Sequence, residues 1–332
     1  MSGIFSQFGI VDESTYNTPV AVSRFYEFTK ESIKADYATI DSKAVRNQAR
    51  TLRSDRFVVN PKGAKGTVEM EVLNKNFGLW LKHMLGSVAS SGAGAAGDVT
   101  HTGTVGSLTG KSFTAQVGRP LVGGVTGTPF TYGGGKIASW TLSNSVDGIL
   151  NLGVDLDFAS EVLPGAGAAA LQAVSYPAAQ EVFSFVGGAL TVDAASVPVK
   201  DVSIKCDNGL DDARYFLRGN AAKKEPLEAA MRKFDVGFTA DFDSMTLYNK
   251  VASTTAAGSL GALVLTWTAP TLIGTTPFFA PTLTITLPAV RFDGETPNVS
   301  GPDSLEFKMG GYALDAGAGP ITVVYKTTDV AP

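Results

Sequence analysis

The chain has 332 residues, 44% hydrophobic and 17% charged, so it is long enough to bury a substantial core. A net charge of −4 argues against a protein whose whole surface binds nucleic acid, because such binding needs a basic face. The single cysteine, Cys206, excludes an internal disulfide framework, and two histidines exclude a histidine-rich metal site. With no secretory-signal pattern and no apolar run of about 20 residues, we expect assembly in a reducing cytoplasm.

The first segment, residues 1–35, alternates single aromatic residues with small and polar ones at neither the helical nor the strand period. Two interpretations stay open: an arm that packs on a neighbouring subunit, or an ordinary first strand and loop. Residues 36–332 are predicted to form one β domain, because Val, Thr and Gly are frequent and charge is low. Gly/Ala-rich stretches near 87–110 and 163–180 are predicted to be loops.

Basic residues cluster on a predicted strand over residues 37–53 and just after it. Aromatic residues, which would stack on bases, are not interleaved with Arg46, Arg50, Arg53 and Arg56. A solvated strand face or an intersubunit salt-bridge surface is therefore favoured over a nucleic-acid site. Beyond the cluster, residues 57–72 are expected to form a strand, a turn at Pro61-Lys62-Gly63 and a second strand.

The clearest helix is predicted over residues 74–85, with Asn74 as N-cap and Gly86 as the residue that ends it. Apolar residues recur there at the helical period: Phe77, Trp80, Leu81, Met84 and Leu85. This single apolar stripe predicts a helix that lies across a sheet and covers it. His83 falls on the polar side and is expected to be exposed to solvent.

The segment 137–158 predicts a β-hairpin around a Val146-Asp147-Gly148 turn. On its second strand, one face is apolar: Leu150, Leu152, Val154, Leu156 and Phe158. The opposite face is small, polar and acidic: Asn151, Gly153, Asp155 and Asp157. Residues 234–243 alternate in the same way, with a second polar face: Asp235, Gly237, Thr239, Asp241 and Asp243.

Catalytic and metal-binding motifs are weak. Gly110-Lys111-Ser112 is not a phosphate loop, because the required first glycine would fall at Val105 and a strand follows. The Asp155/Asp157 and Asp241/Asp243 pairs are suited to cation binding or acid–base work, but strand alternation alone produces them. We therefore predict no enzyme activity, no cofactor and no metal.

Two further short helices are expected, over residues 225–233 and 244–251. Many short strands with Gly/Pro turns and one strong helix predict a mainly β fold, a β-sandwich or open barrel with helical cover.

Five stretches carry a resemblance to a known family: residues 111–120, 136–158, 190–219, 232–250 and 283–315. In order and spacing they resemble the tail tube (major tail) proteins of long-tailed bacteriophages, in particular those of actinobacteriophages. The last stretch is the most telling, with a strand ending at Leu287-Pro288 and a Pro297…Pro302 loop that leads into another strand. The resemblance covers the chain from about residue 40 onward.

The resemblance implies a β-sandwich with a flanking helix, six copies to a ring, and rings stacked into a hollow tube. Each subunit would contribute strands to a continuous inner β-barrel, while long loops and terminal arms reach between rings. The lumen would hold the tape measure protein and conduct viral DNA, neither of them bound sequence-specifically. Tail terminator and distal tail proteins would be further partners. The protein would be part of the virion tail, assembled in the host cytoplasm without a membrane.

A lumen lined by Lys and Arg would trap DNA, whereas an acidic one would repel it. We therefore hypothesise that these residues line the bore: Asn151, Asp155, Asp157, Thr239, Asp241 and Asp243. Exposure to outer solvent is the open alternative. The same comparison places Phe77, Trp80, Leu81 and Met84 outside the barrel, in the core or at a subunit interface.

A different binding class remains as the alternative function: a virion surface or decoration protein, or a carbohydrate-binding adhesin domain. A sugar binder would expose tryptophan and tyrosine in loops near Asp or Asn. Here Trp80, Trp140 and Trp267 lie within predicted helices and strands rather than loops, which counts against sugar binding. A β-sandwich hydrolase is the weakest alternative, because it needs an acid pair in a cleft.

Overall fold

The computed structural model describes residues 3–299, 301–302 and 304–332. Met1 and Ser2, at the start of the expected N-terminal arm, and Ser300 and Asp303, in the stretch 283–315, lie outside the described residues. The fold is mainly β, with few and short helices. The mainly β prediction is therefore confirmed.

One large sheet, which we call the front sheet, contains the predicted hairpin. Its strands are β3 (Lys30–Glu31), β4 (Lys34–Asp41), β5 (Phe57–Glu71), β9 (Gly127–Ser145), β10 (Asn151–Phe158), β14 (Val199–Asp207), β17 (Lys233–Asp241) and β20 (Glu306–Ala313). They pair antiparallel in the order β5–β10–β9–β14–β17–β20, and both β3 and β4 pair with the other side of β5.

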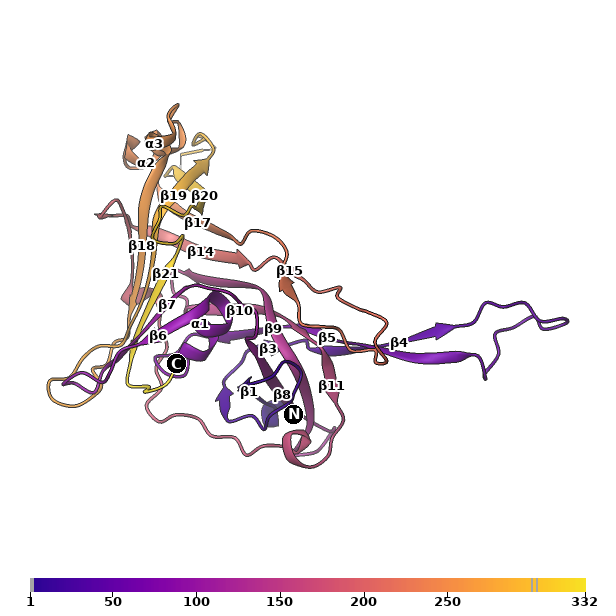
Figure 1. Cartoon of the computed structure of the whole chain (residues 1–332). Helices are drawn as coiled ribbons and strands as arrows, with labels where there is room; N and C mark the ends of the chain where they lie inside the picture. The colour runs from indigo at the N-terminus through magenta and orange to yellow at the C-terminus, as the bar shows by residue number, and fades with distance from the viewer. Residues whose placement is uncertain (1–2, 300, 303) are drawn as a thin grey trace.

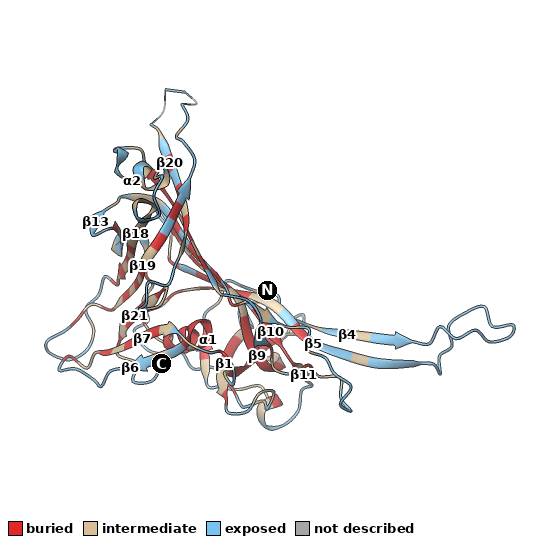
Figure 2. Cartoon of the chain, turned by 45° about the horizontal axis from the view of Figure 1, so that its top comes forward, coloured by how far each residue is buried: buried red, intermediate tan, exposed pale blue. Residues whose placement is uncertain are grey.

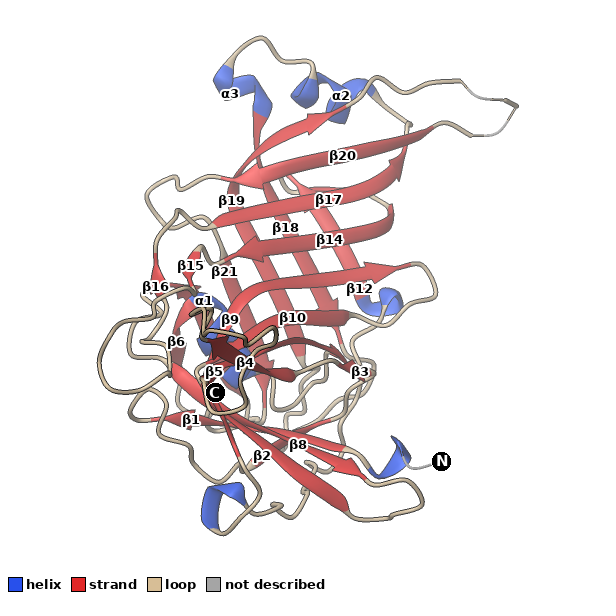
Figure 3. Ribbon diagram, turned by 90° about the vertical axis from the view of Figure 1, so that its right-hand side faces the viewer, coloured by secondary structure: helices blue, strands red, loops and turns tan. Residues whose placement is uncertain are grey.

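A second layer, the back sheet, lies behind the front sheet. Its strands are β6 (Gly86–Ser90), β7 (Val99–Val105), β12 (Gly188–Val192), β13 (Ala195–Ser196), β18 (Leu260–Thr268), β19 (Thr282–Gly294) and β21 (Thr322–Thr327). They follow the order β13–β12–β18–β19–β21–β7–β6. The long strand β19 also pairs with β20, so the two layers are continuous at one margin. In Figure 3 the front strands run across the view and β18, β19 and β21 cross behind them.

A third, smaller sheet is built on the first half of β9. Its other strands are β1 (Gln7–Glu13), β2 (Arg24–Tyr26), β8 (Ser112–Pro120) and β11 (Ser160–Val162). The remaining elements are short: η1 (Gly3–Phe5), α1 (Gly78–Leu85), η2 (Gly167–Ala169), η3 (Phe185–Gly187), β15 (Leu210–Asp211), β16 (Leu227–Glu228), α2 (Met245–Val251) and α3 (Ala256–Ser259). The first 35 residues thus contribute strands β1, β2 and β3, which follows the strand-and-loop interpretation within this chain.

The two large sheets share one hydrophobic core. Inward-facing residues of both layers are buried: Leu142, Leu152, Val154, Ile204, Val236, Leu265, Leu283, Ile285 and Val323. Trp267 on β18 also reaches across and donates a hydrogen bond from Nε1 to Asn144 Oδ1 on β9, at 3.3 Å. In Figure 2 buried residues recur along the strands of both layers, interrupted by intermediate and exposed ones, as expected for strands with one face in a core.

The hairpin forms as predicted. Asp147 takes a positive φ of 58°, and the Gly148 amide donates to the Ser145 carbonyl at 2.9 Å, which closes the tight turn. The apolar residues of β10 are all buried, as their period of two requires.

Helix α1 differs from its prediction. It begins at Gly78, later than expected, and Asn74 does not cap it, because Asn74 Oδ1 accepts a hydrogen bond from the Glu181 amide instead. Seven of its eight residues are buried, because β1, β2 and β8 of the small sheet pack on one side and the back sheet on the other. Gly86 ends the helix in the left-handed conformation, as predicted.

The expected exposure of His83 is wrong. Its ring is buried against Phe113, and Nε2 donates to Asp12 Oδ1 at 2.7 Å. Burial lowers the pKa of His83, and the Asp12 carboxylate opposes that shift. The same contacts, with Lys82, hold the pKa of Asp12 at about 2 although burial alone would raise it.

Acidification should therefore destabilise the fold through His83. The imidazole stays neutral in the folded chain, whereas the unfolded chain gains a proton below a pKa of about 6.5, so stability falls as the pH drops through that value. The loss reaches up to about 1.4 kcal/mol per pH unit for one group. Urea unfolding at pH 7.5 and pH 5 should show a smaller pH dependence in His83→Gln than in the unsubstituted chain; equal dependences would contradict this assignment.

Four other segments differ from their predictions. Strand β4 ends at Asp41, so residues 42–53 of the strand predicted over residues 37–53 are loop. Residues 57–71 form one continuous strand, because Pro61 lies in a two-stranded ribbon opposite Tyr37. Much of the loop expected near residues 87–110 is instead strand, because β6 and β7 both fall within it and pair with each other. Residues 225–233 are extended rather than helical, because their side chains attach to neighbouring elements.

Candidate functional site

The outward face of the front sheet is the candidate functional surface of the chain. Residues that oppose each other across antiparallel strands share a face, so each register row can be followed across the sheet. One such row consists of Asn151, Ser143, Ser203, Gly237 and Gly310, on β10, β9, β14, β17 and β20. We call this surface the polar face; Figure 3 views these strands broadside.

The polar face is rich in hydroxyl groups and small residues and is acidic overall. Its acidic residues on β10, β14, β17 and β20 are Asp155, Asp201, Asp207, Asp235, Asp241 and Glu306. Its basic residues there are Lys200, Lys205, Lys233 and Lys308. Two of the lysines are neutralised by carboxylates of this face: Lys200 contacts Asp241 and Glu306, both at 2.9 Å, and Lys233 contacts Asp235 at 2.7 Å.

Three of the six residues hypothesised to line a bore are exposed on the polar face. Asn151 and Asp155 lie on β10, and Asp155 accepts hydrogen bonds from Thr67 Oγ1 at 2.8 Å and Ser139 Oγ at 2.5 Å. Asp241 lies at the end of β17 beside Lys200. Thr239 shares this face but is 7% exposed, between Asp201 and Lys308 in the register.

The other two hypothesised residues do not belong to the exposed face. Asp243 follows the end of β17, and its amide donates to the Asp241 carbonyl in the connection to α2. Asp157 is 2% exposed and forms an ion pair with Lys223, which is also buried. A segment far away in sequence covers Asp157, which period-two alternation could not reveal.

Residues 208–232 form that cover, and we call them the strap. The strap connects β14 to β17 and is fastened by charged contacts. Glu225 accepts from Lys136 Nζ at 2.5 Å and from the Gly110 amide at 2.6 Å, and Lys65 pairs with Asp212. Burial raises the pKa of the Asp157 carboxyl, against the opposing effect of Lys223. Burial likewise lowers the pKa of Lys136, against Glu225.

The strand β14 adds exposed polar residues to the polar face, and the sequence reasoning missed them. Its side chains alternate between buried apolar positions and exposed polar ones, the latter being Asp201, Ser203, Lys205 and Asp207. Cys206 was interpreted correctly as a small buried residue, and burial raises the pKa of its thiol to about 12. The period-two alternation that predicts a buried Cys206 also predicts that the polar residues between the buried positions of this strand are exposed.

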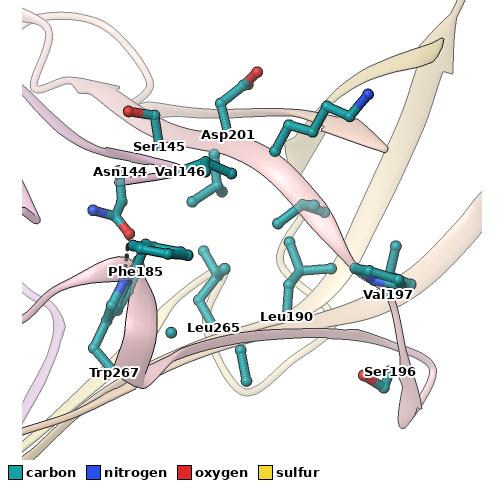
Figure 4. Close-up of a pocket in the computed structure, with 16 residues that line it drawn as sticks. Asn144, Ser145, Val146, Phe185, Leu190, Ser196, Val197, Asp201, Leu265 and Trp267 are labelled. Carbon is teal, nitrogen blue, oxygen red and sulfur yellow. Dashed lines mark hydrogen bonds between the residues drawn. The ribbon is translucent and has the colours of Figure 1, made fainter. Parts of the chain in front are cut away.

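A recess opens at the margin between the two sheets, with a volume of about 330 Å³ (Figure 4). Leu190, Leu265 and Trp267 form an apolar floor, and Lys200 and Asp201 lie among the lining residues. The Lys200 ammonium is already held by Asp241 and Glu306. The lining thus combines an apolar floor with polar and charged side chains at its rim.

Metal-ligating clusters, membrane-spanning helices and exposed tryptophans were sought in residues 3–299, 301–302 and 304–332. No three His, Cys, Asp or Glu side chains in that part converge as a metal site requires. No helix there is long and apolar enough to cross a membrane. Trp80, Trp140 and Trp267 are all buried, so none forms the exposed aromatic platform that a sugar binder uses.

A second feature projects from the molecule. Strand β4, the loop 42–56 and the first half of β5 form a long hairpin, residues 34–63, which we call the arm. It extends away from the sheets on the side of the polar face (Figure 1). The basic residues of the sequence cluster lie in its loop, where Arg53 contacts Asp55 at 2.7 Å.

Comparison with known proteins agrees with this architecture. A search of curated proteins gave no match. The family model described as phage tail tube protein matches residues 5–318, nearly the whole chain. The mainly antiparallel β fold, with a helix buried beside its sheets, agrees with the expectation from the sequence resemblance. The chain belongs to the phage tail tube protein family, and it is therefore a structural component of a virion tail that assembles with other copies and other tail proteins.

Proposed function

We propose that six copies of this chain form a ring, that rings stack into a hollow tube, and that the polar face lines its bore. The polar face is the observation that carries this proposal. It is a sheet surface of small, hydroxyl and acidic side chains whose opposite side packs into a mainly apolar core. DNA phosphates are repelled by such a surface, whereas one dominated by Lys and Arg would hold them. Front sheets joined into one inner barrel would also remove free sheet edges.

In this proposal the bore holds the tape measure protein before infection and conducts the viral DNA during infection. Neither would be bound sequence-specifically. Tail terminator and distal tail proteins would close the two ends of the tube, and assembly would take place in the host cytoplasm. The role is mechanical and electrostatic, without catalysis or a cofactor.

Negative-stain microscopy of the purified protein tests the assembly directly. Tubes, or rings with six-fold symmetry, are the expected result. A protein that remains a monomer at every concentration and salt condition would contradict the proposal.

Charge reversal on the polar face tests its role in DNA passage. Asp155→Lys combined with Asp201→Lys places two cations on this face, at register rows six residues apart along β9, and both positions are exposed. Tails should still assemble, but DNA release should slow several-fold, with a smaller effect at high salt because salt screens exposed charges. The measurement is the rate of DNA release from particles that carry the variant.

The control for this test changes the same number of charges elsewhere. Glu27→Lys with Glu295→Lys alters two exposed acids outside the front sheet, one after β2 and one after β19, and should leave the release rate unchanged. Asp157 is unsuitable for charge reversal, because it is buried against Lys223. A polar-face variant that releases DNA at the normal rate would refute the assignment of this face to the bore.

A further inference from the structure

The outer part of the strap, residues 214–224, holds four basic residues and no acidic one, and we call it the basic loop. Its two ends lie side by side, because the Lys224 amide donates to the Arg214 carbonyl at 2.9 Å. Its tip is closed by Arg218, whose Nη2 donates to the Ala222 carbonyl at 2.6 Å. These contacts gather positive charge that is spread along the sequence into one compact segment.

Most of the charge of the basic loop is not compensated within the described part of the chain. The carboxylates close to the loop are each paired with another cation: Asp157 with Lys223, Asp212 with Lys65 and Glu225 with Lys136. Lys223 is thereby neutralised, whereas Arg214, Arg218 and Lys224 form no ion pair with any described carboxylate. Arg218 and Lys224 are exposed to solvent, so their charges are open to a partner.

The three uncompensated cations border a common cavity with a volume of about 430 Å³. Arg214, Arg218 and Lys224 line it, together with Asn220 from the tip of the loop and Tyr16 from the N-terminal segment. This volume falls in the range of small-ligand pockets, about 300–1,000 Å³. Guanidinium groups match the oxygens of a phosphate with paired N–H donors, and an ammonium adds a point charge. The chemistry of the lining therefore favours a phosphate group.

An exposed aromatic ring lies beside the same cations. Phe216 is 52% exposed, and the ring centroid lies 5.9 Å from the Arg214 guanidinium carbon and 5.4 Å from Lys224 Nζ. The neighbouring Tyr215 fixes the loop, because its hydroxyl donates to the Lys62 carbonyl at the base of the arm, at 2.6 Å. Proteins that bind single-stranded nucleic acid combine cations for the backbone with aromatic rings on which bases stack. The basic loop has both, whereas the basic residues of the loop 42–56 have no aromatic residue among them.

From these observations we propose that the basic loop binds single-stranded nucleic acid, with a phosphate in the cavity and a base stacked on Phe216. An acidic peptide satisfies the cations but leaves the aromatic ring unused. A duplex supplies phosphates, but its bases are already stacked inside the helix. Binding is independent of sequence, because every base has a face that can stack. The site is complete within one subunit, so it goes beyond the proposed tube and does not require it.

Fluorescence anisotropy of a labelled oligothymidylate with the full-length protein tests the site. Arg218→Glu with Lys224→Glu should weaken binding at least about tenfold, and added salt should weaken binding by the unsubstituted chain, because the cations contact phosphates. Arg46→Glu with Arg50→Glu makes the same change of charge in the loop 42–56 and should alter the affinity by less than about twofold at physiological salt. Both variants should keep the circular dichroism spectrum of the unsubstituted chain, because the four positions are exposed.

A second variant separates stacking from phosphate binding. Phe216→Ala should weaken oligothymidylate binding about tenfold, because a base loses the ring on which it stacks. The same variant should bind pyrophosphate, measured by calorimetry, as tightly as the unsubstituted chain does, because the cations of the cavity remain. Equal effects on both ligands would contradict the division of the site into a phosphate cavity and a stacking ring.

Competing ligands decide whether a single strand is the partner. Oligothymidylate should bind more tightly than a blunt duplex, a polyglutamate peptide or thymidine monophosphate; equal affinity for any of these would overturn the assignment to a single strand. Unchanged binding in the Arg218/Lys224 variant, or an equal loss in the Arg46/Arg50 variant, would overturn the site itself. These measurements concern the subunit alone, so their failure leaves the proposed tube intact. A chain that forms no tubes would instead refute the proposed function without bearing on the basic loop.

Discussion

Replacing Trp80 with alanine should lower the free energy of unfolding by about 3–5 kcal/mol. The indole is fully buried at the centre of an aromatic cluster, stacked on Phe8 at a centroid distance of 6.3 Å and edge-on to Tyr26 at 5.4 Å. Phe113 completes the contact at 6.2 Å. Because these rings come from β1, β2 and β8, the cavity would loosen the attachment of α1 to the small sheet. Urea denaturation of the unassembled protein measures the loss.

Two controls separate packing from other effects. Trp80→Phe keeps most of the ring and removes an indole N–H that has no hydrogen-bond partner among the described residues, so its cost should be much smaller. Phe278→Ala, at a 59% exposed position, should change stability by less than about 0.5 kcal/mol. Normal monomer stability with lost assembly in Trp80→Ala would place this residue at a subunit interface and contradict the core assignment.

Breaking the buried ion pair beneath the strap should have an effect of similar size. Lys223→Met leaves the Asp157 carboxylate buried without its cation, which should cost about 3–5 kcal/mol. Asp157 Oδ2 already has no hydrogen-bond partner among the described residues, so the carboxylate has little other compensation. The double variant Lys223→Met with Asp157→Leu removes both charges and should recover most of the loss. Lys65→Met, which breaks the exposed pair with Asp212, should cost at most about 1 kcal/mol.

The pH dependence of Lys223→Met gives an independent check. Burial raises the pKa of Asp157, and Lys223 is the main group that opposes this shift. Burial already holds the folded pKa of Asp157 above the unfolded value of about 4, and without Lys223 it rises further, so the stability of the variant should rise more steeply as the pH falls toward that value. The variant should therefore be less destabilised at pH 5 than at pH 8. An equal loss at both values would show that the ion pair is not the cause.

The sequence alone could predict the hairpin, because its information is local. A turn residue that tolerates positive φ and strict alternation on both sides are enough to fix strands, turn and buried face. The same logic explains why Cys206 and the three tryptophans were correctly expected to lie within regular elements. The polar face was also visible in this way, at least on β10 and β17.

Contacts between distant segments could not be predicted from local pattern. His83 follows the polar side of its helix, but Asp12 lies 71 positions away and provides a buried partner. Pro61 predicted a turn, yet it lies within strand β5. The strand tolerates a proline there because Pro61 pairs only with β4 on one side, and no second strand needs its missing N–H on the other. The alternation along β10 predicts an exposed Asp157, but the strap, residues 208–232, covers this residue.

By itself, then, the sequence determined the β class, the two-sided character of the front strands and the family resemblance, because each depends on residue types at short, regular spacing. Only the tertiary structure decided which acidic residues stay exposed on the polar face, since exposure depends on what the rest of the chain lays over a strand. It also decided that residues 34–63 project from the sheets as a two-stranded hairpin. The strap has no periodic signature, because contacts with distant segments hold it in place.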